Sequence, residues 1–224
     1  LDLAFAWLEA HVPDPDDAVV IAHGDAGPGN FLYHDGHVTA LIDWEFSHLG
    51  DPMDDIAWFS MRCVMEPVPD FMAALRYYEK ISGRSIDRQR LLYHRVLVSA
   101  RVVVIRHRQF AGEPAHAIVS RGLNRRLLVE ALADASGLPK PQPQAVDAPE
   151  TDRTELYDRV IGELGDVVVA LSTNRQVIAT AKNAAKVIKY LKAIDRFGPS
   201  IEQSELAALT KLLGTRPEGV DAGR

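Results

Sequence analysis

The chain has 224 residues, of which 47% are hydrophobic, so it can form one large domain or two small ones. Its formal net charge of −6 argues against nucleic acid as a partner and suits, without requiring, a cationic substrate. Cys63 is the only cysteine, which excludes an internal disulfide and favours a reducing, cytoplasmic location. The longest apolar run, residues 96–105, is too short to cross a bilayer, so no membrane span is expected.

The chain opens with a pattern that predicts a short helix followed by a strand. The helix is expected to bury one side, formed by Leu1, Phe5, Leu8 and Val12. Pro13 and Pro15 stop this helix and turn the chain. The apolar residues Ala18–Ile21 predict a brief strand that delivers His23 and Asp25 to a loop.

Residues 31–42 predict a β-hairpin. Its strands are Phe31–Tyr33 and Val38–Ile42, and Asp35-Gly36 is the turn, because these residue types tolerate the positive φ of a two-residue hairpin loop. A hairpin brings its ends together. Asn30 and Asp43 are therefore expected to lie close in space, with Asp25 beside them on the preceding loop.

These three polar side chains suit the transfer of a phosphoryl group from a nucleotide. Magnesium takes hard oxygen ligands, which Asp43 and the Asn30 amide oxygen can supply. Asp25 can orient a hydroxyl and accept its proton. Each residue also has an ordinary explanation, since Asp25 can cap a turn and Asp43 can end a strand. The glycines at 24, 27 and 29 do not form a P-loop, because no Gly-Lys-Ser/Thr follows them.

Four sequence blocks in this region resemble the aminoglycoside phosphotransferase and choline-kinase-like family. The blocks are His23-Gly24-Asp25, Asn30-Phe31-Leu32, Ile42-Asp43-Trp44-Glu45 and Gly50–Ala57. The resemblance implies that Asp25 is the catalytic aspartate and that His23 supports it at the catalytic site. It implies that Asn30 and Asp43 bind Mg²⁺ and thereby ATP, and that Asp55 braces the catalytic loop by hydrogen bonds. It also implies a mainly α fold with a small β-hairpin, the C-terminal lobe of a protein-kinase-like fold, over residues 1–135.

The residues after the hairpin are expected to be mostly helical. Residues 45–51 are expected to form a connecting segment after the hairpin. Asp51 is predicted to be the N-cap of a helix, with Pro52 at its first position. Further helices are predicted from Pro67 onward to Ser82-Gly83, and over residues 86–110 and 115–135. Three acidic residues near the site either attract a cationic acceptor or lie in a solvated loop, and they are Glu45, Asp51 and Asp54. Arg101 is expected to snorkel at the edge of the core.

A Pro-rich linker over residues 136–150 precedes a small helical domain over residues 151–214 and a disordered tail over residues 215–224. Helices are predicted from Asp152 or Thr154 to about Leu171 and from Asn174 to Phe197. Gly198-Pro199 is expected to end the second, and Ser200 to start a third. The second helix has a basic stripe of Arg175, Lys182, Lys186, Lys189 and Arg196. Such a stripe is more typical of a solvated face, but it can also dock an acidic protein partner or a nucleotide phosphate.

The N-terminal lobe of a kinase-like fold cannot be identified in this sequence. Residues 1–22, which precede His23, contain no lysine or arginine to bind nucleotide phosphates. The first hypothesis is a small-molecule kinase that moves the γ-phosphoryl group of ATP to a substrate hydroxyl, here without its N-terminal lobe and therefore weakly active or inactive. The alternative is a non-catalytic binding or adaptor module.

Overall fold

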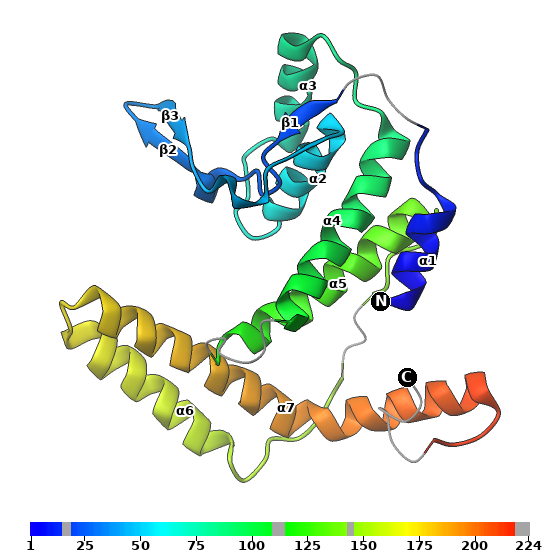
Figure 1. Ribbon diagram of the computed structural model, residues 1–224. Helices are drawn as coiled ribbons and strands as arrows, with labels where there is room; N and C mark the ends of the chain where they lie inside the picture. The colour runs from blue at the N-terminus through cyan, green and yellow to red at the C-terminus, as the bar shows by residue number, and fades with distance from the viewer. Residues whose placement is uncertain (15–18, 109–114, 143–145, 218–224) are drawn as a thin grey trace. The chain divides into compact units, whose positions relative to one another are not determined.

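The computed structural model describes residues 1–14, 19–108, 115–142 and 146–217, and the chain forms two compact units. The first unit contains Leu1–Ala111 and Arg121–Pro141, and the second contains Gly112–Ser120 and Gln142–Arg224. Helices dominate the described residues of both units, with short antiparallel strands in the first (Figure 1). The predicted fold class, mainly α with a small β-hairpin, is confirmed.

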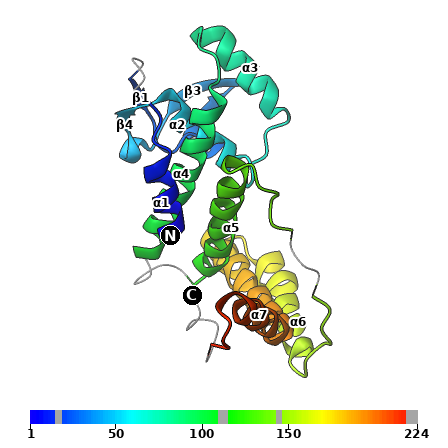
Figure 2. The same cartoon turned by 90° about the vertical axis from the view of Figure 1, so that its right-hand side faces the viewer.

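Three helices build the main core of the first unit. They are α1 (Asp2–Ala10), α4 (Arg88–Arg108) and α5 (Ala117–Ala135). Figures 1 and 2 both show α1 beside α4. Their shared cluster contains Ala4, Leu8, Val96, Ala100, Leu128 and Ala131. The predicted buried side of α1 was therefore wrong except at Leu8: Leu1, Phe5 and Val12 are exposed, because Ala4 and Leu8, one helical turn apart, are the residues that pack into this cluster.

Helix α2 (Pro52–Arg62) links the core to the predicted site. Its N-cap is Asp51, whose side chain accepts a hydrogen bond from the Met53 amide, and Pro52 occupies the first turn as predicted. On one side Ala57 and Trp58 pack against Val98 of α4. On another side Met53 and Ile56 pack against Leu75 of α3 (Phe71–Ser82).

The predicted hairpin and its turn are confirmed. Strand β2 (Phe31–His34) pairs antiparallel with β3 (His37–Leu41), from Phe31 opposite Leu41 to His34 opposite His37. Asp35 has φ of 48° and Gly36 has φ of 76°, the conformation that a two-residue turn of this kind demands.

A second strand pair was not predicted. Strand β1 (Val20–Ala22) pairs antiparallel with β4 (His48–Gly50), within the segment that was expected to be a connection. Strand β4 has 3 residues, too few to show an alternating pattern in the sequence. In this pairing Gly50, just before α2, lies opposite Val20 at the start of β1, and His48 lies opposite Ala22 at its end.

Three predicted helix starts were wrong by a few residues. Helix α3 begins at Phe71 rather than Pro67, because the Asp70 carboxylate accepts a hydrogen bond from the Ala73 amide and caps the helix. Helix α4 begins at Arg88 rather than Ile86, because the Asp87 carboxylate accepts hydrogen bonds from the amides of Gln89 and Arg90 and so caps the helix. Helix α5 begins at Ala117 rather than Ala115. The predicted C-terminal end of α4 at Phe110 lies outside the described residues.

The second unit contains α6 (Thr154–Gly162), its π-helical continuation η3 (Glu163–Val169) and α7 (Arg175–Leu213). The predicted stop at Gly198-Pro199, and with it a separate third helix from Ser200, was wrong, since α7 runs on for 39 residues with Pro199 inside it. Proline fixes φ close to the helical value, but it lacks the amide donor and its ring crowds the carbonyl four residues earlier in the helix. Gly198 before it has no Cβ to clash with the proline ring, so the helix continues. Most of the predicted disordered tail, residues 218–224, lies outside the described residues.

The basic stripe of α7 is less continuous than the sequence suggested. Arg175, Lys182, Lys186 and Lys189 are exposed, as a solvated face requires. Arg196 instead donates to the Ala148 carbonyl at 2.8 Å and lies 3.7 Å from a Glu150 carboxylate oxygen. The last residues of the predicted linker thus pack against α7. Among the described residues, no helix is long and apolar enough to cross a membrane.

Candidate active site

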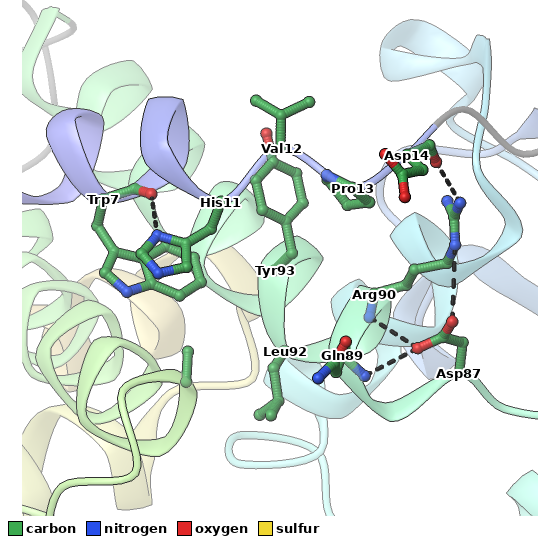
Figure 3. Close-up of a pocket in the computed structure, with 11 residues that line it drawn as sticks. Trp7, His11, Val12, Pro13, Asp14, Asp87, Gln89, Arg90, Leu92 and Tyr93 are labelled. Atoms are coloured by element: carbon green, nitrogen blue, oxygen red, sulfur yellow. Dashed lines mark hydrogen bonds and ion pairs between the residues drawn. The ribbon is translucent and has the colours of Figure 1, made fainter.

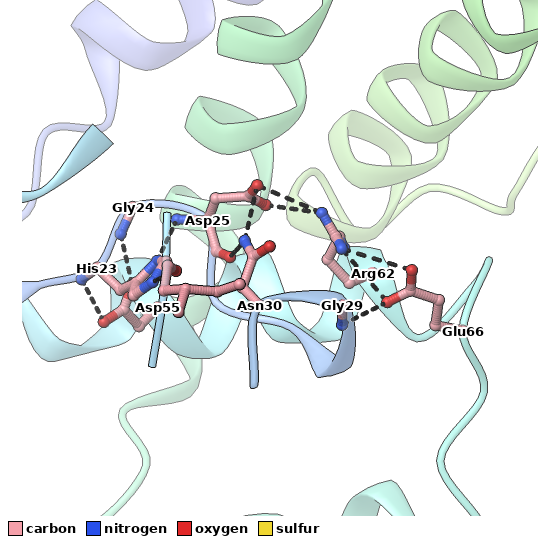
Figure 4. Close-up of polar contacts among 9 residues, drawn as sticks. His23, Gly24, Asp25, Gly29, Asn30, Asp55, Arg62 and Glu66 are labelled. Carbon is pink, nitrogen blue, oxygen red and sulfur yellow. Dashed lines mark hydrogen bonds and ion pairs between the residues drawn. The ribbon is translucent and has the colours of Figure 1, made fainter. Parts of the chain in front are cut away.

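The loop that follows β1 is held by the first turn of α2. The backbone amides of His23 and Gly24 donate hydrogen bonds to the two carboxylate oxygens of Asp55, at 2.8 Å and 2.9 Å (Figure 4). Both carboxylate oxygens of Asp55 therefore bind the loop backbone. A carboxylate that accepts two amide hydrogen bonds fixes the path of that backbone.

Gly24 is required by its surroundings. Its φ is 79°, in the left-handed region, and an added Cβ would lie 2.2 Å from the Phe46 carbonyl oxygen. A side chain at position 24 would therefore push apart the two segments that meet here.

His23 is buried and connects the loop to the end of the hairpin. The residue is 4% exposed, and its Nε2 lies 2.9 Å from the Ile42 carbonyl oxygen. Its ring also packs against Trp44, with the ring centroids 4.6 Å apart. This geometry suits a supporting role for His23 behind Asp25.

Asn30 faces Asp25 directly. Its Nδ2 donates to the Asp25 carbonyl oxygen at 2.8 Å and to Asp25 Oδ2 at 3.1 Å (Figure 4). Both partner atoms are acceptors, so only the amide nitrogen of Asn30 can occupy this position. The Asn30 amide oxygen takes no part in this contact, and it is the atom that a magnesium ion would use.

Asp43 follows the hairpin directly. The Ile42 amide donates to the Asn30 carbonyl at 3.0 Å, so the two ends of the hairpin meet as predicted. Asp43 has φ of 68°, which is unusual for a residue other than glycine, and its exposed side chain does not cap the short helix η2 (Trp44–Phe46). Residues in such strained conformations are concentrated at functional sites.

The donor set fits a magnesium ion that takes most of its ligands from phosphate and water. The described residues contain no group of three or more His, Cys, Asp or Glu side chains that could hold a metal ion. Asn30 and Asp43 offer one amide oxygen and one carboxylate. Magnesium bound together with a nucleotide commonly uses one or two carboxylates and completes its octahedron with phosphate and water oxygens.

One partner of Asp25 could not be anticipated from the sequence. Arg62, the last residue of α2, donates from Nη1 to Asp25 Oδ1 at 3.0 Å and to Oδ2 at 3.3 Å (Figure 4). Arg62 lies 37 positions after Asp25, and no motif or helical spacing links the two residues. Packing of α2 against the loop brings them together.

The acidic residues near the site are mostly engaged in structural pairs. Asp54 is 1% exposed and accepts a hydrogen bond from Arg101 Nη2 at 3.0 Å. Asp51 pairs with Arg90 at 2.6 Å. Arg101 is therefore an ion-pair partner rather than a snorkelling residue, and Asp54 does not lie in a solvated loop. Of these three acidic residues, for which attraction of a cationic acceptor and a solvated loop were the two alternatives, Glu45 is the exposed one.

A cavity of about 450 Å³ lies elsewhere in the first unit, between the end of α1 and the start of α4 (Figure 3). Trp7 and His11 stack along its edge, with ring centroids 4.2 Å apart, and Tyr93 also lines it. Arg90 and Asp14 also line the cavity, and Arg90 donates a hydrogen bond to the Asp14 carbonyl oxygen. None of the predicted site residues lines this cavity, so it is separate from the loop.

A family comparison agrees with the motifs. The model of the Phosphotransferase enzyme family (APH) covers the region that contains the loop, the hairpin and α2. Residues 1–92 match this family. The match confirms the resemblance predicted from the four sequence blocks.

Curated relatives share a short segment with the chain. Acyl-CoA dehydrogenase family member 11 of Homo sapiens is 39% identical over 57 residues, which cover 25% of this chain and 7% of that protein. The Rattus norvegicus protein of the same name is 35% identical over 63 residues, which cover 27% of this chain and 8% of that protein. Acyl-CoA dehydrogenase family member 10 of Mus musculus is 35% identical over 72 residues, covering 31% and 6%. The chain thus spans less than a tenth of each of these relatives.

Proposed function

We propose that residues 23–62 hold the catalytic loop and metal site of a phosphotransferase that moves the γ-phosphoryl group of ATP to a hydroxyl of a small molecule. The observation that carries this proposal is the pairing of Asp25 with Asn30 on a loop held by Asp55. The pairing uses the amide nitrogen of Asn30 and leaves its amide oxygen for a metal. The match to the Phosphotransferase enzyme family supports the same reaction class.

The site residues have two roles: some hold the metal that neutralises phosphate charge, and others orient the acceptor hydroxyl. Bound Mg²⁺ would supply neutralisation of the phosphate charges, and Asn30 and Asp43 are the residues that would hold it. Asp25 orients the acceptor hydroxyl and takes its proton as the new oxygen–phosphorus bond forms. The bond between the γ-phosphorus and the bridging oxygen breaks, and ADP leaves. His23 and Asp55 keep the loop in the conformation that places Asp25.

Nucleotide binding is the first test of this proposal. The 224-residue chain is titrated with ATP by calorimetry, with and without Mg²⁺, beside the variants Asp43→Ala and Glu45→Ala. Binding is expected to require Mg²⁺ and to weaken on the order of 10-fold or more in Asp43→Ala, because a metal ligand is lost. Glu45→Ala removes an exposed acidic residue two positions away and is expected to bind like the parent. A folded chain that binds no Mg²⁺-ATP, or an Asp43→Ala variant that binds normally, would contradict the proposal.

Asp25→Asn separates catalysis from binding. Removal of the group that accepts the proton is expected to lower kcat by about 100-fold or more while the KM for ATP changes little, since Asp25 acts on the acceptor. The readout is ATP turnover with water as the acceptor, followed by a screen of hydroxyl compounds. Equal turnover in Asp25→Asn and the parent chain would assign Asp25 a purely structural role.

A further inference from the structure

We propose that Arg62 is a positioning residue for the reaction, which holds the Asp25 carboxylate in its working orientation. This inference rests on the proposed function and deepens it by one residue. It comes from a set of contacts around the end of α2 that ties Arg62 to the loop from three directions.

The first direction is the carboxylate itself. Arg62 Nη1 lies 3.0 Å from Asp25 Oδ1 and 3.3 Å from Oδ2, while Asn30 donates to Oδ2 alone. The side chains of Arg62 and Asp25 are only 18% and 17% exposed, so solvent and salt screen their pairing weakly. With Asn30 alone, the carboxylate would remain free to turn. With both partners, the positions of both oxygens are defined.

The second direction is the loop backbone. A Cβ added to Gly27 would lie 2.9 Å from Arg62 Nε, and a Cβ added to Gly29 would lie 2.6 Å from Arg62 Nη2. The absence of side chains at these two positions therefore allows the guanidinium to lie directly against the turn. These glycines have no phosphate-loop motif, and their contacts with Arg62 provide a reason for their presence.

The third direction is Glu66, one helical turn beyond Arg62. Arg62 Nη2 lies 3.4 Å from both Glu66 oxygens, and Glu66 Oε2 accepts the Gly29 amide at 3.3 Å. The Glu66 amide in turn donates to the Arg62 carbonyl at 2.8 Å. The guanidinium is thus held on one side by Glu66 and on the other by Asp25, as its planar fork of donors permits.

These contacts matter because phosphoryl transfer depends on positioning. The protein contributes little covalent chemistry to such a reaction, and a displacement of about 1 Å at a catalytic group can cost about 100-fold in rate. The side-chain contacts of Arg62 are with Asp25 and Glu66, so it acts on the reaction through the Asp25 carboxylate.

The test compares Arg62→Ala, Arg62→Lys and Arg95→Ala in the 224-residue chain. Arg95 makes a matched pair with Asp134, also at 3.0 Å and partly buried, and has no contact with the loop. Steady-state ATP turnover in Mg²⁺ gives kcat and KM for each variant. Arg62→Ala is expected to lose kcat on the order of 100-fold with KM for ATP within about twofold. Arg62→Lys is expected to recover part of the loss, and Arg95→Ala to behave like the parent.

Two results would overturn the assignment. A kcat in Arg62→Ala equal to or above that of the parent would show that Arg62 does not position Asp25. An equal loss in Arg95→Ala would show a general effect of removing an ion pair. If the parent chain neither binds nor turns over Mg²⁺-ATP, the proposed function fails. The role of Arg62 is then decided by hydrogen exchange over residues 24–33, which must be faster in Arg62→Ala than in Arg95→Ala for the positioning contact to stand.

Discussion

Two neighbouring carboxylates of α2 face different partners. Asp55 accepts the backbone amides of the loop at positions 23 and 24, whereas Asp54 accepts Arg101 and lies 3.5 Å from His94 Nδ1 on α4. Consecutive residues of an α-helix point about 100° apart, which allows adjacent aspartates to serve separate regions. Asp55 binds backbone amides and fixes the loop, whereas Asp54 pairs with a charged side chain and joins α2 to α4. Of these two aspartates, we therefore expect the loss of Asp55 to lower activity more and the loss of Asp54 to lower stability more.

Asp54→Asn is expected to have the largest effect on stability. The change leaves the Arg101 guanidinium without its buried carboxylate, and a buried pair broken from one side typically costs about 3 kcal/mol or more. The free energy of unfolding is measured with urea. Tryptophan fluorescence reports on the first unit alone, because Trp7, Trp44 and Trp58 all belong to it. A loss below about 1 kcal/mol would show that the cost of burying the charges cancels their attraction.

Asp55→Asn is expected to cost less stability and more activity. Asparagine keeps one acceptor oxygen but turns an amide donor toward a backbone amide, so about 2 kcal/mol of hydrogen bonding is lost. The loop is then free to move, and kcat for ATP turnover is expected to fall on the order of 10-fold or more. Both quantities are measured on the same preparation as for Asp54→Asn. The comparison between the two carboxylates breaks if Asp55→Asn unfolds as readily as Asp54→Asn and keeps full turnover.

A low pH should remove the contribution of Asp54 to stability in the unmutated chain. Burial by itself raises the pKa of Asp54, but the hydrogen bonds and charges of His94 and Arg101 outweigh it and hold the pKa below its usual value. His48 is the other titratable group nearby, with its Nε2 at 3.8 Å. A lowered folded-state pKa stabilises the protein above the unfolded pKa of about 4, and this stabilisation is lost as pH falls through the folded-state pKa. Fluorescence-monitored stability is expected to fall below about pH 4, and less steeply in Asp54→Asn.

The local parts of the site were predictable, and the long-range ones were not. Asp35-Gly36 predicts the hairpin because turn chemistry acts over two residues, and the hairpin then brings residue 42 to Asn30. The Asp55 bracing was expected from the family motif. Arg62 and Asp25 meet only because α2 packs beside the loop, which no spacing in the sequence reports.

The same limit applied to the fold. Asp54 and Arg101 are 47 positions apart, and the helical pattern of each segment shows where charges lie but not which ones pair. In the second unit the local stop at Pro199 was overridden, because a proline preceded by glycine can remain in a long helix. Short-range rules therefore located the strands of the hairpin and most helices, and missed the pairings and the continuous α7.

Arg101→Lys sharpens the comparison with the smallest expected effect. Arg101 reaches Asp54 through a single hydrogen bond from Nη2, and its guanidinium lies 6.0 Å from the centroid of the Trp58 ring. Lysine preserves the charge and can supply one hydrogen bond, but it loses the planar fork, so about 1 kcal/mol of stability is expected to be lost. Urea unfolding followed by tryptophan fluorescence measures this loss directly beside Asp54→Asn. If the two variants lose the same stability, the geometry of the guanidinium rather than its charge stabilises Asp54. In that case both carboxylates of α2 would depend on directed hydrogen bonds, and the distinction between them would lie only in their partners.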